Sequence, residues 1–249
     1  MFRINLKSSN SNIEKYSKIA IFLFPIFFIS VLVFNKIIFG PGNILYFMFL
    51  AEDGPIEYST SIFYFLSSVF SVVVAINFLK VKKKTLALLY ILLSAGLFFM
   101  GAEEISWGQR ILLVDTPEFF AGNLQNEITF HNFPKLHNLV IIGYFLVGLI
   151  GSFLWIFLPK LNKLKIKYMI HFIIPQRYLM SYFVPIFLFV GMLAIRSFGP
   201  TSSDGFWFYV FNWRDLEALE FLLAVGIFLF VISKIILWYN LKSQSNLAK

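Results

Sequence analysis

The sequence predicts an all-α polytopic membrane protein, built as a bundle of six transmembrane helices with both termini in the cytoplasm. Hydrophobic residues make up 59% of the 249 residues and charged residues only 14%, whereas a typical soluble domain is about 25% charged. Six apolar runs each approach the roughly 20 residues that cross the hydrocarbon core of a bilayer. Every second connection between these runs is rich in lysine and arginine.

The chain divides into two short tails and one helical domain. We expect residues 1–18 and 239–249 to be cytoplasmic tails, and 19–238 to be a single six-helix transmembrane domain. The apolar runs that define the six helices are 19–39, 56–79, 85–105, 138–158, 178–197 and 216–238. The first run is long and lacks a small-residue cleavage site, so we expect it to remain as a helix and not to be removed as a signal peptide.

The distribution of charge predicts the orientation. Lysine and arginine favour the cytoplasmic side, which places the 80–84 turn and the 159–177 loop inside. All 13 acidic residues except Glu14 then fall at outer helix ends or in outer loops. Acidic residues contribute little to orientation, so their position indicates a polar site on the extracytoplasmic face.

Composition also excludes several kinds of chemistry. The chain has no cysteine, which rules out disulfides, thiol nucleophiles and cysteine-ligated metals. The net charge of +8 comes from the loops expected inside. We interpret it as a topology signal and as contact with anionic lipid, and we expect no nucleic-acid partner. The predicted partner is the lipid bilayer.

The second helix carries a polar stripe. Gly54 and Pro55 indicate its start, because proline is favoured in the first helical turn. Five polar residues recur from there on one helical face. They are Glu57, Ser61, Tyr64, Ser68 and Ser71. The stripe is either a seam that packs against another helix or the lining of a polar site with Glu57 at its top.

The densest motif is GAEEISWGQR, residues 101–110, at the outer end of the third helix. Two adjacent carboxylates, Glu103 and Glu104, end this helix, where the helix dipole disfavours negative charge. If the helix continued, Glu103 and Arg110 would share a face together with Ser106 and Trp107. Glu104 lies about 100° further round, so we expect it to face the bundle. We expect Arg110 to pair with one of the two acids, either in a functional site or as a clamp on the long loop.

The loop 106–137 holds two of the three histidines. Thr116-Pro117-Glu118 indicates a helix start, so a short interfacial helix is expected from Phe119 to His131. Glu127 and His131 would then share a face at a spacing that can hold one metal ion, with His137 just beyond. A site of Glu104, Glu127, His131 and His137, with Glu57 opposite and Glu103 as a further ligand, would suit Zn²⁺ or another divalent ion. The alternative is that His131 only caps a re-entrant loop.

Two further features concern the last three helices. Asp215, Glu217 and Glu220 open the sixth helix, where acidic residues usually favour the helix N-terminus. Glu217 and Glu220 also share a face that is able to point inward. Gly148 and Gly151 lie three residues apart on the fourth helix and favour close contact with a neighbouring helix.

The segment GAEEISWGQR, together with NLQNEITFHNF at 123–133, resembles uncharacterised bacterial multi-pass membrane proteins. The resemblance covers about residues 50–140. It implies location in the bacterial cytoplasmic membrane and carries no activity.

Three functions fit these features. The first is a hydrolase or transferase that acts on a lipid or lipid-linked substrate, with Glu104 or Glu127 as general base and Arg110 holding a charged head group. The second is an ion- or proton-coupled transporter that uses Glu57, Glu104 and Glu220 as a proton or cation site. The third is a non-catalytic scaffold or assembly subunit of a membrane complex.

Overall fold

The computed structural model describes residues 12–40, 43–51, 53–123, 126–158, 167–197 and 214–247. Within these ranges the chain is helical and contains no strand. Six helical segments are long and apolar enough to cross a membrane, which confirms the predicted class of all-α, multi-pass membrane protein. These segments are Asn12–Phe39, Pro55–Lys80, Lys84–Glu104, Asn138–Phe157, Met169–Leu193 and Asp215–Ser243.

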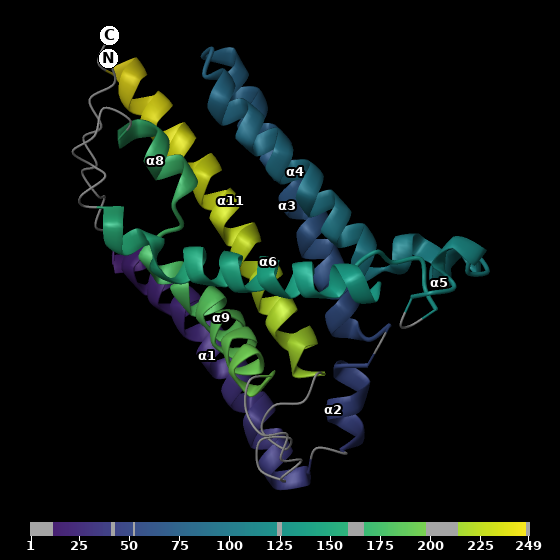
Figure 1. The fold of residues 1–249 in the computed structure, drawn as a ribbon. Helices are drawn as coiled ribbons and strands as arrows, with labels where there is room; N and C mark the ends of the chain where they lie inside the picture. The colour runs from purple at the N-terminus through teal and green to yellow at the C-terminus, as the bar shows by residue number, and fades with distance from the viewer. Residues whose placement is uncertain are drawn as a thin grey trace.

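Helices α3 (Pro55–Lys80) and α4 (Lys84–Glu104) form an antiparallel hairpin (Figure 1). Proline occupies the first turn of α3, as predicted. The polar stripe of α3 forms much of the seam between the two helices. The Ser61 hydroxyl donates to the Gly101 carbonyl at 2.7 Å, and the Ser68 hydroxyl donates to the Ser94 carbonyl at 2.8 Å. These bonds satisfy polar groups between helices, so this part of the stripe serves packing.

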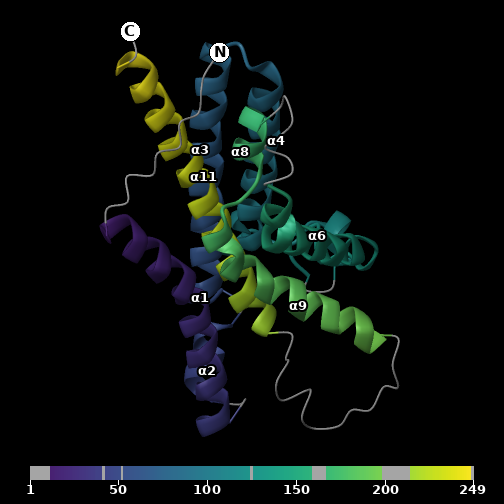
Figure 2. The ribbon, with the colours of Figure 1, turned by 90° about the vertical axis from the view of Figure 1, so that its left-hand side faces the viewer.

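The long helix α11 (Asp215–Leu247) lies beside α3 (Figures 1 and 2). Helix α6 (Pro134–Phe153) packs against α9 (Met180–Ser197). At Gly151 an added Cβ would lie 2.3 Å from the Phe183 ring, and at Gly148 it would lie 2.9 Å from the Phe187 nitrogen. The predicted close approach at these two glycines is confirmed, because neither position has room for a larger side chain.

Helix α8 (Lys167–Ile173) ends inside the bundle, before α9 begins. Carbonyl groups at such an end need donors, because the bilayer core offers no water. Lys234 of α11 donates to the carbonyls of His171 and Ile174 at 2.9 and 2.7 Å, and the Tyr90 hydroxyl donates to the carbonyl of Phe172 at 2.6 Å. These bonds hold the end of α8 against α4 and α11. The fifth span of the structure, Met169–Leu193, is therefore a broken helix that begins before the predicted run 178–197.

The first helix, α1 (Asn12–Phe39), lies at the outside of the bundle (Figure 2). Most of its apolar surface is exposed, as expected for a face that meets lipid. Helices α1 and α11 both extend into the segments expected to be tails, since α1 begins at Asn12 and α11 ends at Leu247. The remainder of those tails, 1–11 and 248–249, lies outside the described residues.

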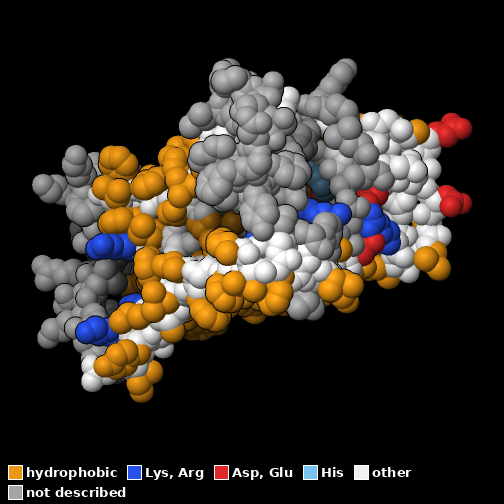
Figure 3. Space-filling view, turned by 90° about the horizontal axis from the view of Figure 1, so that it is seen from below, with side chains coloured by type: hydrophobic (Ala, Val, Ile, Leu, Met, Phe, Trp, Pro, Cys, Tyr) orange, Lys and Arg blue, Asp and Glu red, His pale blue; other side chains and the backbone are white. Residues whose placement is uncertain are grey.

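The C-terminus of α4 and the N-termini of α3 and α11 lie toward one end of the bundle, which we call the acidic end (Figure 1). The turn between α3 and α4 and the C-terminus of α11 lie at the other end. Seen from the lower side of Figure 1, apolar side chains cover the left part and the lower edge of the described surface, and the acidic side chains in view lie toward its right end (Figure 3). The short helix α2 (Ile44–Phe49) also lies at the acidic end.

Candidate functional site

Helix α4 ends at Glu104, and the chain then turns sharply. Ser106 and Trp107 both have left-handed backbone conformations, with φ of 48° and 54°, which non-glycine residues adopt rarely. The helix therefore does not continue through residues 101–110, which was the condition for Glu103 and Arg110 to share a helical face. Because the turn follows immediately, Glu103 and Glu104 keep their helical directions while the loop folds back over Glu103.

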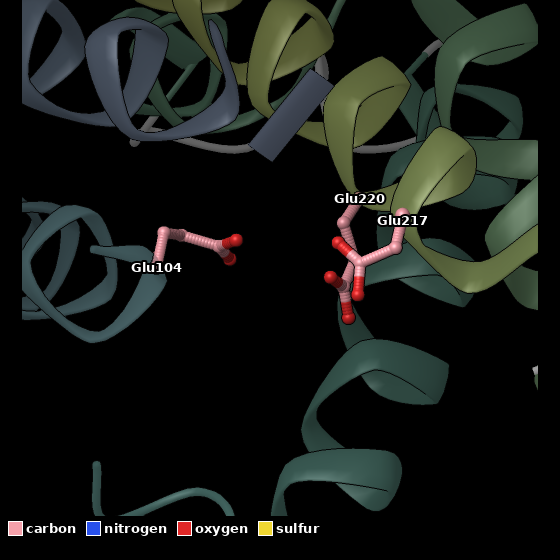
Figure 4. A group of neighbouring side chains, drawn as sticks. All are labelled: Glu104, Glu217 and Glu220. Atoms are coloured by element: carbon pink, nitrogen blue, oxygen red, sulfur yellow. The ribbon is translucent and has the colours of Figure 1, made fainter. Parts of the chain in front are cut away.

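Glu104 meets two carboxylates of α11 at the acidic end. Carboxylate oxygens of Glu104, Glu217 and Glu220 lie within 4.8 Å of one another (Figure 4). We call these three residues the acid triad. Glu104 and Glu220 are only 8% and 9% exposed, so the expectation that Glu104 faces the bundle is met. Figure 4 shows the three side chains pointing toward one another from two different helices.

Two tyrosines complete the surroundings of the acid triad. Tyr144 of α6 forms a hydrogen bond with Glu220, and Tyr64 of α3 lies close enough to interact electrostatically with Glu104 and Glu220. Within the described part of the chain, neither of these two glutamates forms an ion pair with lysine or arginine. Neighbouring carboxylates repel when ionised, so the triad is suited to share a cation or protons.

A second cluster surrounds Glu103, which is 1% exposed. Its carboxylate accepts four hydrogen bonds from the loop that follows α4. The donors are Trp107 Nε1 at 2.6 Å, the Phe130 and His131 backbone nitrogens at 2.7 and 2.9 Å, and His131 Nδ1 at 3.1 Å. Glu103 thus anchors the loop and orients the His131 ring, whose side chain remains about one-third exposed.

Arg110 forms ion pairs with Asp53 and Glu127, two acids that the sequence did not assign to it. The Ser106 hydroxyl donates to Glu127 at 2.6 Å, and the Asp53 backbone nitrogen donates to Glu57. This chain of contacts joins the start of α3 to the long loop. Arg110 and Glu127 therefore clamp two connections together, which is the structural alternative considered for this arginine.

The predicted metal ligands fall into different clusters. Glu104 belongs to the acid triad, Glu127 to the Arg110 clamp and His131 to the Glu103 cluster. The side chain of His137 lies outside the described side chains. The helix expected from Phe119 to His131 is wrong for the residues the structure describes, which form a 3₁₀-helix at Glu118–Phe120 followed by turns. Without that helix, Glu127 and His131 share no face.

A third cluster fixes the start of α11. Lys36 of α1 forms a buried ion pair with Asp215, and the Tyr46 hydroxyl of α2 donates to Asp215 at 2.5 Å. Burial and the bond to Asp215 raise the pKa of Tyr46 above its ordinary value, so the hydroxyl stays a donor. Two elements, α1 and α2, therefore hold the first turn of α11 at Asp215, two residues before Glu217. The only sequence signal for this cluster was Lys36 itself, a lysine at the end of an apolar helix.

The fold and the clusters define the class of this chain as a multi-pass helical membrane protein with acidic residues buried at one end of its bundle. No protein-family model matches the chain, and comparisons with curated proteins and with solved structures found no significant match.

Proposed function

We propose that this protein is a membrane enzyme that binds a divalent cation at the acid triad and hydrolyses or transfers a group of a lipid or lipid-linked substrate. The observation that carries the proposal is the approach of the three carboxylates of Glu104, Glu217 and Glu220 to within 4.8 Å. Two of them come from α11 and one from α4, so the tertiary fold assembles the group.

The ligand set favours a hard cation. All three side chains offer carboxylate oxygens, which suit Mg²⁺, Mn²⁺ or Ca²⁺ better than softer metals. The histidine that would favour zinc, His131, is engaged by Glu103. When bound, such a cation polarises a carbonyl or phosphoryl oxygen and activates a coordinated water.

The protein's own residues supply proton transfer and positioning. His131 is held by Glu103 through Nδ1, an arrangement that fixes the orientation of an imidazole ring. Its partial exposure leaves the ring accessible to a substrate. Since Glu103 and Glu104 are consecutive, the imidazole and the acid triad belong to the same end of the bundle. We assign His131 as general acid or base and Glu103 as its positioning residue.

The depth of the acid triad supports chemistry at a membrane surface. Glu104 is the last residue of α4, and Glu217 and Glu220 lie in the first two turns of α11. Transporters usually bind substrate near the middle of the bilayer, whereas a helix end lies near the head groups. By the charge distribution we place this end, and the reaction, on the extracytoplasmic side of the bacterial cytoplasmic membrane.

Cation binding is tested on purified protein in detergent, by titration with Mn²⁺ and measurement of free Mn²⁺ by electron paramagnetic resonance. We expect one site in the wild type, and a loss of affinity on the order of tenfold or more in Glu104→Gln and Glu220→Gln, because each removes one anionic ligand. The control is Glu118→Gln, which changes an exposed acid outside the triad. Equal affinity in all four proteins would overturn the cation site.

Catalysis is tested separately. The protein is incubated with total membrane lipid, with and without a chelator, and the products are compared by mass spectrometry. We expect a product that requires the metal and disappears in Glu104→Gln and in His131→Ala. A cation site without any product would remove the enzyme proposal while leaving the site in place.

One observation favours a second candidate, a cation- or proton-coupled transporter. Two of the three acids, Glu104 and Glu220, are buried, and the side chains in and around the acid triad come from four spans, α3, α4, α6 and α11. A coupling site shared by several helices would be able to change its exposure when they move. Cation-dependent uptake into vesicles that is lost in Glu220→Gln would support this candidate over the enzyme.

A further inference from the structure

The loop after α4 carries the most exposed large apolar side chain of the described residues, that of Leu113. Leu113 is 89% exposed and Leu112 is 70% exposed, and Ile111 and Val114 beside them are also exposed. Residues 111–114, which we call the apolar tip, form the end of α5 (Gln109–Leu112) and the turn after it. Figure 1 shows α5 projecting sideways from the bundle.

The apolar tip is held in place at its base. The Gln109 side-chain amide donates to the Thr116 hydroxyl at 2.7 Å, and its carbonyl accepts from the Ile128 nitrogen at 2.6 Å. The Thr116 hydroxyl in turn donates to the Asn126 carbonyl at 2.6 Å. These bonds close the loop beneath the tip. Leu113 also adopts a left-handed backbone conformation, with φ of 53°, which is energetically unfavourable for leucine.

The charged groups beside the apolar tip are either paired or exposed. Arg110, just before it, forms ion pairs with Asp53, just before α3, and with Glu127 of the same loop. Asp115 and Glu118 follow the tip and are exposed. Four consecutive apolar residues thus stand between a neutralised arginine and two acids. Contiguous exposed apolar side chains of this kind mark surfaces that bind a protein or a membrane.

Exposed aromatic side chains connect the end of α4 with the loop that carries the apolar tip. Phe98 and Phe99, in the last turns of that span, are exposed, and the Phe99 ring makes an edge contact with Trp107 at 5.7 Å between centroids. The Trp107 nitrogen is bound to Glu103. Tryptophan with an apolar ring exposed and its polar atom satisfied is typical of the membrane–water boundary.

From this continuity we infer that the apolar tip inserts into the bilayer, and that its partner is the acyl-chain region of the leaflet at the acidic end. Insertion holds the loop 105–133, and with it His131, against the membrane surface. Four side chains are too few for a stable protein–protein interface by themselves, whereas they suffice to dip a loop into lipid beside a helix that already spans it.

The absence of cysteine from the chain allows a direct test. Leu113→Cys is labelled with an environment-sensitive fluorophore, and the full-length protein is reconstituted into phosphatidylcholine–phosphatidylglycerol vesicles. Val114→Cys serves as a second site on the tip, and Glu118→Cys is the matched control on the same loop. Emission and quenching by phospholipids that carry a nitroxide on the acyl chain are measured for each position.

We expect a blue shift and strong quenching by the nitroxide lipids at 113 and 114, and water-like emission with weak quenching at 118. Water-like emission at both tip positions would overturn the inference. A blue shift at 113 and 114 without lipid quenching would also overturn it, because the tip would then be covered by protein, such as a second copy of the chain.

Discussion

Glu103 and Glu104 are adjacent at the end of α4, yet their carboxylates belong to two different clusters. Glu103 is surrounded by donors from the loop, while Glu104 points across to Glu217 and Glu220 of α11. The cause is the helical rotation of about 100° per residue, combined with a loop that folds back on one side only. Removing the negative charge at these two neighbouring positions, by Glu103→Gln and by Glu104→Gln, should therefore have opposite effects on the stability of the protein.

Glu103→Gln should destabilise the protein. Glu103 now accepts hydrogen bonds from Trp107 and from backbone nitrogens. The amide nitrogen of a glutamine would place its own N–H donors against at least one of these donors, and that hydrogen bond would be lost. Hydrogen bonds to a charged acceptor contribute about 1.5–3 kcal/mol each, so we expect a loss of about 2 kcal/mol or more in the free energy of unfolding. Thermal unfolding in detergent gives the global effect, and hydrogen exchange at 126–133 gives the local one.

Glu104→Gln should leave stability unchanged or raise it when no divalent cation is added, because the substitution relieves repulsion with the two neighbouring carboxylates of Glu217 and Glu220. Saturating Mn²⁺ should stabilise the wild type and not this variant, since a ligand that binds only the folded state adds to its stability. If Glu104→Gln lowered the melting temperature as much as Glu103→Gln, the two clusters would not be independent.

The Tyr46 hydroxyl predicts a specific loss of stability at high pH. Burial and the bond to Asp215 raise the pKa of Tyr46 in the folded protein, so the unfolded chain releases this proton first, near the ordinary value of about 10. The contribution of Tyr46 to the free energy of unfolding is present in full below pH ~10 and is lost as the pH rises above that value. Tyr46→Phe should therefore flatten the fall of the melting temperature between pH 9 and 11, compared with the wild type.

The ion pair between Lys36 and Asp215 should contribute both to the stability of the fold and to cation binding at the acid triad. Breaking a buried ion pair at one partner typically costs about 3 kcal/mol, so Lys36→Met should lower the free energy of unfolding by roughly that amount. The double variant with Asp215→Asn should recover most of the loss, as a double-mutant cycle would show. Lys36→Met should also weaken Mn²⁺ binding, because Asp215 lies two residues before Glu217. Unchanged affinity would indicate that the first turn of α11 keeps its position without this pair.

The glycines of α6 offer a matched pair for the helix interface. Gly151→Ala would place a methyl group 2.3 Å from the Phe183 ring, and overpacking of this kind costs about 1–3 kcal/mol. Gly143→Ala meets no atom within 4 Å and should be neutral or stabilising, because alanine favours helix more than glycine does. Thermal unfolding of both variants distinguishes a close packing contact from a general effect of glycine in a helix.

The sequence by itself determined the class of protein and most helix boundaries. Hydropathy over about 20 residues and Pro55 at the start of α3 are local signals, and local signals decide where a helix begins and whether it suits lipid. The close approach at Gly148 and Gly151 was also predictable, because small residues on a membrane helix indicate contact whatever the partner is. The inward direction of Glu104 followed from helical geometry alone.

The tertiary structure decided which side chains meet. Glu217 and Glu220 looked like residues that favour a helix N-terminus. They join Glu104 only because α11 packs beside α3, which itself packs against α4, more than 100 positions away in the sequence. Arg110 meets Asp53 and Glu127, and His131 meets Glu103, because the chain turns left-handed at Ser106 and Trp107. Hydropathy and helical periodicity describe single segments, whereas these contacts depend on how segments pack and on one turn that no local pattern indicates.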